Sequence, residues 1–133
     1  MSDTEQEIMR LVSDRDASTA GLYAMLRYHL GLDGSGSSGK RMRPLLGLLA
    51  YASIAGDHHK ALPGAAAVEL GHNFSLVHDD IEDGDSERRH RTTLWARNGI
   101  PQAINAGDML FSLSRIALHR LSDLGFPDSK VRG

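Results

Sequence analysis

The sequence has 133 residues, a length typical of one domain, and no cysteine, which excludes disulfides and thiolate metal sites. A formal net charge of −2 argues against wholesale electrostatic binding to nucleic acid, and no apolar run approaches the roughly 20 residues that span a bilayer. The polar, acidic start is typical of neither a signal peptide nor a transit peptide. We therefore expect a cytoplasmic protein without a nucleic-acid partner and without stable membrane insertion.

The first part of the chain has apolar residues at helical spacing. A polar break at residues 16–19 divides them, which predicts two amphipathic helices within residues 5–31. The helical positions are Ile8, Leu11, Val12, Leu22, Met25, Leu26 and Leu30. Residues 31–39 are rich in Gly and Ser, so we expect a mobile loop there.

The middle and end of the chain also indicate helices. Pro44 and Pro63 can each occupy the first turn of a helix. Residues 45–54 are apolar nearly all round, which predicts a helix buried on most sides. The helix that begins at Pro63 is expected to reach residue 83, followed by a polar loop at 84–91 and a helix at about 100–121. Since no run alternates as strands do, the fold class is predicted to be all-α.

Three carboxylates stand near the end of the second of these helices. Residues 79–83 have the sequence DDIED, which places Asp79, Asp80 and Asp83 at spacings that share a helix face. Like charges so close repel one another, and a positive partner makes the arrangement favourable. Hard oxygen ligands suit Mg²⁺, which is usually shared between carboxylates and phosphates. A solvated acidic helix end is the alternative.

The flanking sequence resembles the trans-isoprenyl diphosphate synthases, or polyprenyl synthetases. Their patterns GGKRxRP, DDxxD and RRGxPT have counterparts here in SGKRMRP (38–44), DDIED (79–83) and RRHRTT (88–93). ELGH (69–72) lies before the aspartates, and QAINAGD (102–108) follows the arginines. Ser38, His90 and Thr92 depart from the pattern, and the last two put the shape of the arginine loop in question.

The resemblance implies a helical bundle of the isoprenoid (terpenoid) synthase type. Family members are more than twice as long and carry a second aspartate-rich motif, so residues 1–133 are expected to form only the N-terminal half of the synthase domain. We expect this half to be inactive alone, and to form a homo-oligomer or to pair with a C-terminal half.

The resemblance also implies condensation of an allylic diphosphate (dimethylallyl, geranyl or farnesyl) with isopentenyl diphosphate. Pyrophosphate leaves, the allylic cation alkylates isopentenyl diphosphate, and a proton is lost. Mg²⁺ would be held by Asp79, Asp80 and Asp83, with Arg88 on the allylic diphosphate. His78 could orient Asp79. The isopentenyl diphosphate would be bound by four side chains: Lys40, Arg43, His72 and Arg89.

Product length is assigned to the helix face before the aspartates. Phe74 and Ser75 stand five and four positions before Asp79, where a bulky side chain would block a growing prenyl tail. An aromatic residue there, with no insertion in DDxxD, resembles the short-chain synthases. Expected products lie between farnesyl and geranylfarnesyl diphosphate in length, with geranylgeranyl diphosphate the first choice.

Four alternatives compete with this interpretation. Residues 34–40 match the start of a phosphate-binding loop, but Arg41 replaces the Ser or Thr that ligates Mg²⁺ and a helix precedes the loop. Glu69 and His72 have the spacing of a di-iron motif, which needs two copies. Class I terpene cyclases share DDxxD but bind no isopentenyl diphosphate. The chain could also be a non-catalytic partner subunit of a full-length synthase.

Overall fold

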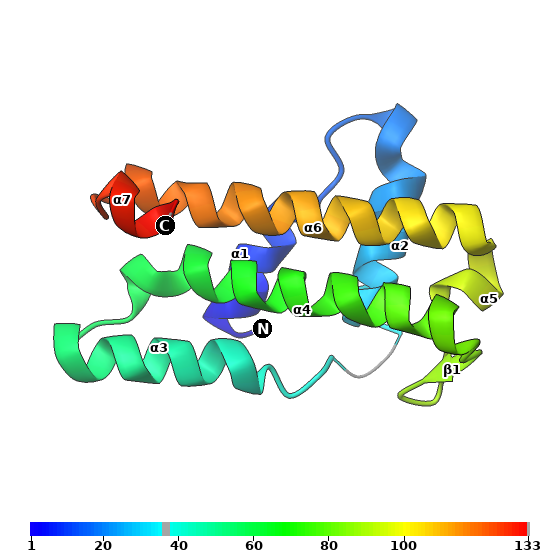
Figure 1. Ribbon diagram of the computed structural model, residues 1–133, viewed down its shortest axis with the longest axis horizontal. Helices are drawn as coiled ribbons and strands as arrows, with labels where there is room; N and C mark the ends of the chain where they lie inside the picture. The colour runs from blue at the N-terminus through cyan, green and yellow to red at the C-terminus, as the bar shows by residue number, and fades with distance from the viewer. Residues whose placement is uncertain (36–37, 133) are drawn as a thin grey trace.

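The computed structural model describes residues 1–35 and 38–132 and is almost entirely helical (Figure 1). Two turns of 3-10 helix, η1 (Ala17–Thr19) and η2 (His59–Ala61), lie before longer helices. The α-helices are α1 (Asp3–Leu11), α2 (Ala20–Leu30), α3 (Met42–Ala55), α4 (Leu62–Asp83), α5 (Leu94–Asn98), α6 (Ile100–Asp123) and α7 (Asp128–Val131). The strands β1 (Glu87–Arg88) and β2 (Arg91–Thr92) form an antiparallel hairpin.

The two longest helices, α4 and α6, run antiparallel and side by side through the molecule (Figure 1). Leu70 of α4 and Leu110 of α6 are completely buried, together with Ile8 of α1 and Leu26 and Leu30 of α2. The predicted all-α fold and the predicted helices are confirmed. No helix in the described ranges is both long and apolar enough to cross a membrane.

Helix α3 corrects one prediction. Of its side chains only Pro44 and Leu48 are buried, while Leu46 is 62% and Ile54 91% exposed. The prediction of burial on most sides is therefore wrong for this structure, because α3 packs mainly against α4, with a further ring contact between Tyr51 and Phe126, and these contacts leave most of its apolar side chains exposed. Apolar composition indicates a tendency to be buried, but does not say which segment covers the helix.

The loop at 31–39 connects α2 to α3 and contains no helix among its described residues. Residues 36 and 37 of the predicted mobile loop lie outside the described residues. The loop begins at Gly31, which adopts φ 69° and ends α2 with backbone bonds to Arg27 and Tyr28. The left-handed conformation suits glycine, which has no Cβ to clash.

Candidate active site

The C-terminal end of α4 presents its three aspartates in two different directions. Asp79 and Asp83 are exposed, whereas Asp80 is 3% exposed. Adjacent helical residues differ by about 100° around the axis, so Asp79 and Asp80 cannot share a direction. Asp79 and Asp83, four residues apart, remain the pair on one exposed face.

The carboxylate of Asp80 forms an ion pair with the guanidinium of Arg88. The Nε atom of Arg88 donates to both carboxylate oxygens at 3.1 Å, and Nη2 donates to Oδ1 at 2.8 Å. These hydrogen bonds, and next the negative charge of Asp80, raise the pKa of Arg88 above its usual value. Asp80 therefore faces Arg88, while Asp79 and Asp83 are exposed, and the shared role of the three carboxylates in holding Mg²⁺ stays a prediction.

Arg88 and Arg89 are positioned by the β1–β2 hairpin. Arg88 pairs with Arg91 across the strands, and the two residues between them, Arg89 and His90, have φ of 53° and 62°. Two positive φ values define the tight turn that favours glycine or asparagine. The predicted polar loop thus contains a hairpin, and His90 holds a conformation that glycine would adopt with less strain.

The hairpin is fastened to α2 through Tyr28. Its hydroxyl donates to the Thr92 carbonyl at 2.8 Å, and its own carbonyl accepts from Arg91 Nη1 at 2.9 Å. The guanidinium groups of Arg91 and Arg97 lie 3.9 and 4.0 Å from the centre of the Tyr28 ring. Arg91 also donates to Asp33, so it joins the hairpin to the Gly- and Ser-rich loop. These contacts fix the direction in which Arg89 extends.

Arg89 lies against the loop that precedes α3. A Cβ atom on residue 39 would lie 2.9 Å from Arg89 Nη1, so Gly39 provides the space that the guanidinium occupies. Lys40, the next residue, is exposed. Two of the four residues predicted to bind isopentenyl diphosphate, Lys40 and Arg89, therefore lie at the same loop.

The other two predicted residues are in direct contact. Arg43 Nη1, at the start of α3, lies 3.1 Å from His72 Nε2 on α4. Burial, and next the charge of Arg43, lower the pKa of His72 from its usual value. The charges of Arg89 and Arg88 also lower this pKa. Such a concentration of positive charge is suited to binding an anion.

Arg41 has a structural role that the sequence did not reveal. It is 9% exposed, and its guanidinium donates to Glu69 at 2.7 Å and to the Leu30 carbonyl at 2.6 Å. Glu69 also accepts from the fully buried Asn73. Glu69 thus supports the loop bearing Lys40 and Arg43, and its carboxylate is not available in the way the di-iron motif requires. The 28-residue separation between Arg41 and Glu69 gave no local signal of this pair.

His29 of α2 was also missed. Its Nε2 atom is buried without a hydrogen-bond partner among the described residues, beside a cavity of about 30 Å³ lined by Asp80, Arg88 and Arg89. Burial, followed by the charges of Arg89 and Arg88, lowers the pKa of His29 to about 3. His29 is therefore a neutral side chain beneath the two arginines. Its helical position among apolar residues resembled that of an ordinary core residue.

The side chains before the aspartates turn toward α6. The ring of Phe74 packs edge-on against Phe111 and His78, with centroid distances of 5.1 and 5.6 Å. His78 Nε2 lies 3.5 Å from Asp108 and would be only 2.3 Å from a Cβ on Gly107. His78 thus faces α6, not Asp79 as expected.

Ser75 is half-buried and donates its hydroxyl to the His72 carbonyl at 2.6 Å. This bond stays within the helix, so Ser75 adds no contact to another element through it. The chain-length role of Phe74 and Ser75 stays a prediction.

Comparison with known proteins places this arrangement in context. The profile of the family described as polyprenyl synthetase matches residues 21–130. The chain is 45% identical over 100 residues to a (2E,6E)-farnesyl diphosphate synthase of Mycobacterium tuberculosis, covering 71% of this chain and 28% of that protein. A geranylgeranyl diphosphate synthase of the same organism is 44% identical over 108 residues, covering 77% and 31%.

The fold has similar counterparts among solved structures. Geranylgeranyl pyrophosphate synthetase from Pyrococcus horikoshii superposes with a TM-score of 0.83 at 36% identity, over 97% of this chain and 36% of that one. Polyprenyl synthetase from Streptomyces coelicolor gives 0.76 at 38% identity, over 90% and 36%. The chain thus spans about a third of the relatives it matches. On the profile, the identities and the fold together, the chain belongs to the polyprenyl synthetase family.

Proposed function

We propose that this chain supplies the diphosphate-binding part of a Mg²⁺-dependent prenyltransferase that condenses an allylic diphosphate with isopentenyl diphosphate. The observation that carries the proposal is the contact between Arg43 and His72, with Arg89 of the hairpin lying against the adjoining loop that carries Lys40. These residues come from three separate segments of the sequence. A diphosphate is recognised by several donors from different directions. Arginine supplies a planar pair of N–H groups and lysine a single positive charge.

The exposed pair Asp79 and Asp83 fits the hard oxygen donors that Mg²⁺ prefers, four residues apart on one helix face. Bound there with substrate phosphates, the ion would neutralise part of the charge on the departing pyrophosphate. Asp80 is included in the proposed metal set from the motif, and its ion pair with Arg88 suggests a second contribution: it fixes the guanidinium in orientation. An oriented Arg88 stabilises developing negative charge without reorganisation.

The remaining residues bind and shape the substrates. Arg43, His72, Lys40 and Arg89 hold the diphosphate of isopentenyl diphosphate, so its double bond is presented to the allylic carbon. Phe74, packed on Phe111, blocks the path of a growing tail along α4. Such a block supports short-chain products, with geranylgeranyl diphosphate the first choice. An apolar surrounding would keep water from quenching the allylic cation.

We also propose that residues 1–133 correspond to the N-terminal half of a synthase domain, which a further segment completes. Two observations support this proposal. The chain spans only about a third of the length of its relatives, and several apolar side chains of α3 are exposed. Leu45, Leu46 and Leu49 are 44–62% exposed. A helix with this surface gains stability when another segment covers it.

Incorporation of labelled isopentenyl diphosphate into an extractable prenyl product tests the proposal. The chain is assayed alone and mixed with a separately produced segment equivalent to the remainder of a related synthase, and complex formation is followed by size-exclusion chromatography. We expect product only from the mixture, and loss of product in the mixture with Arg43→Gln. Turnover by the chain alone would contradict the division of the site, and an inactive complex would contradict the prenyltransferase proposal.

A further inference from the structure

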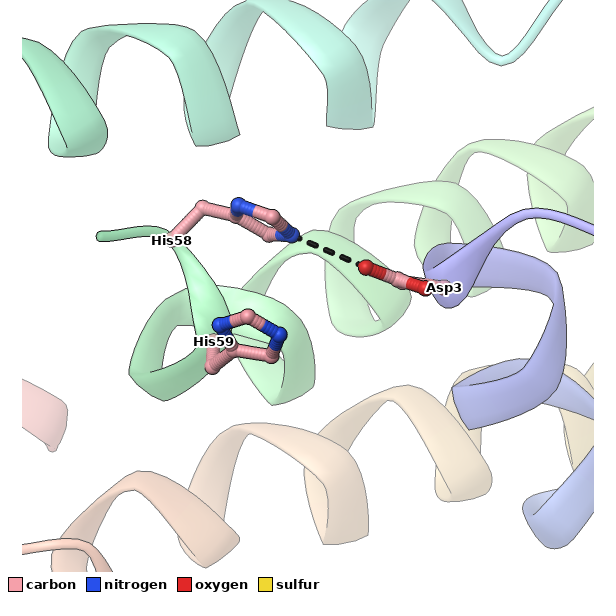
Figure 2. Close-up of side chains that lie close together, drawn as sticks. All are labelled: Asp3, His58 and His59. Carbon is pink, nitrogen blue, oxygen red and sulfur yellow. Dashed lines mark hydrogen bonds and ion pairs between the residues drawn. The ribbon is translucent and has the colours of Figure 1, made fainter.

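A second cluster of polar side chains lies at the opposite end of α4 from the aspartates. His58 and His59 stand in the connection between α3 and α4, and Asp3 lies in the first turn of α1 (Figure 2). One ligand atom from each of the three lies within 4.8 Å of the others. Helix α4, with 22 residues, is about 33 Å long and separates this cluster from the aspartates at its other end.

The geometry of the cluster is close to that of a metal site. His58 Nε2 lies 2.9 Å from Asp3 Oδ2. Two ligands about 2.0–2.1 Å from a tetrahedral ion lie about 3.3 Å apart, so this pair needs only a small outward movement to admit one. The two imidazole rings are stacked, with centroids 4.5 Å apart and planes 20° apart, and the Asp3 carboxylate reaches toward them from α1 (Figure 2).

The orientation of His59 is set by Asp57. The Oδ1 atom of Asp57 lies 2.5 Å from His59 Nδ1 and accepts from the His59 backbone N–H at 2.9 Å. With Nδ1 held in this way, Nε2 remains free to bind. A carboxylate that fixes one nitrogen of an imidazole while the other binds a metal is a recurrent arrangement in metalloproteins. The cluster therefore has three potential ligands, and one of them, His59, is oriented by a fourth side chain, Asp57.

We propose that Asp3, His58 and His59 form a binding site for a divalent transition-metal ion such as Zn²⁺. Two imidazoles and a carboxylate favour such an ion over Mg²⁺, which prefers oxygen ligands. A hollow of about 330 Å³ lined in part by Asp3, Gln6 and His59 adjoins the cluster and has room for water on the remaining coordination position. Because the ligands come from α1 and from the α3–α4 connection, the ion joins the N-terminal helix to the bundle.

The competing explanation is a surface ion pair between His58 and Asp3 beside an unrelated His59. The metal site and the surface ion pair predict different effects of replacing each histidine on the affinity for a metal ion. The hydrogen bond and charge of Asp57 raise the pKa of His59, so the tag-free chain is titrated with Co²⁺ at about pH 8, well above the ordinary pKa of an imidazole. The visible absorption band of bound Co²⁺ reports the coordination number through its intensity and position. Zn²⁺ affinity then follows from displacement of Co²⁺, and Mg²⁺ in excess should displace neither.

We expect one Co²⁺ per chain with a micromolar dissociation constant and the absorption of a four-coordinate ion. His58→Gln and His59→Gln should each weaken binding by more than about tenfold, and Asp57→Asn by about tenfold. His119→Gln, at an exposed position on α6, is the matched control and should bind as the unchanged chain does. Circular dichroism of each variant verifies the fold.

Stability gives an independent readout. Zn²⁺ should raise the midpoint of thermal unfolding of the unchanged chain and of His119→Gln, but not that of His59→Gln, because an ion that binds only the folded state stabilises it. Equal Co²⁺ affinity in the His58→Gln, His59→Gln and His119→Gln variants would overturn the proposal, as would displacement of Co²⁺ by Mg²⁺. Neither result depends on prenyl transfer, so this site and the proposed function fail separately.

Discussion

The guanidinium of Arg88 spans the carboxylate of Asp80, with Nε 3.1 Å from each oxygen and Nη2 2.8 Å from Oδ1. Only 4% of the Asp80 side chain is exposed, against 32% for Arg88. The pair closes the end of α4 onto the hairpin eight residues later. It also divides the aspartate motif into one structural carboxylate and two exposed ones.

Replacement of Asp80 should therefore affect stability where replacement of Asp79 does not. Asp80→Asn keeps the shape but removes the charge, and should lower the free energy of unfolding by about 1–3 kcal/mol. The exposed control Asp79→Asn should change it by less than about 0.5 kcal/mol. Urea unfolding of both variants measures the difference. Equal stabilities would show that the ion pair contributes nothing to the fold.

Arg41 and Lys40 are adjacent in sequence, but truncation should lower the stability strongly at Arg41 and hardly at all at Lys40. Arg41→Ala leaves Glu69 buried without its partner and should lower the free energy of unfolding by about 3–5 kcal/mol. Lys40→Ala removes an exposed side chain and should change it by less than about 0.5 kcal/mol, while weakening anion binding. Urea unfolding checks the first effect. A similar small loss in both variants would mean that Arg41 does not hold the loop.

The neutral state of His29 gives the stability a definite pH dependence. Its pKa is about 3 in the folded chain against an ordinary 6.5, so between these values the unfolded chain takes up a proton that the folded chain does not. The contribution of the neutral His29 to the free energy of unfolding is thus fully present above about pH 6.5. It decreases as the pH falls, by up to about 1.4 kcal/mol per pH unit.

His29→Gln removes that contribution. As the pH falls below 6.5, the free energy of unfolding should decrease less steeply for the variant than for the unchanged chain. His72, whose pKa is also lowered, remains in both proteins and contributes equally to each. Parallel pH profiles from urea unfolding would show that His29 is already protonated in the folded chain.

Several features were predictable from the sequence because they depend on neighbours along the chain. The extent of α4 follows from Pro63 at its start and a glycine after Asp83, with helical spacing between. The proximity of Arg43 to His72 came from the family resemblance. The ion pair between Asp80 and Arg88 did not, because it depends on the direction in which the chain leaves α4 and enters the hairpin. The exposure of α3 depends on segments that pack against it, which composition does not specify.

Phe74 provides a test of product length in the complete synthase. Its ring fills the space between α4 and Phe111, so Phe74→Ala should open roughly the volume of a phenyl group and shift the products to longer chains. Ser75→Phe adds bulk on the same side and should shorten them. Chromatography of the dephosphorylated alcohols resolves the lengths. Unchanged profiles in both variants would place the limiting surface on other residues.

The most direct test of the account is calorimetric titration of the chain with inorganic pyrophosphate, with and without Mg²⁺. We expect pyrophosphate to bind, and Mg²⁺ to strengthen the binding. Arg43→Gln and His72→Gln should each weaken it by about tenfold, because each removes one charge-assisted hydrogen bond. Asp79→Ala should remove the effect of Mg²⁺, whereas the exposed control Arg115→Gln should bind as the unchanged chain does. Equal pyrophosphate affinity in Arg43→Gln, His72→Gln and Arg115→Gln would contradict the claim that these segments form one diphosphate site.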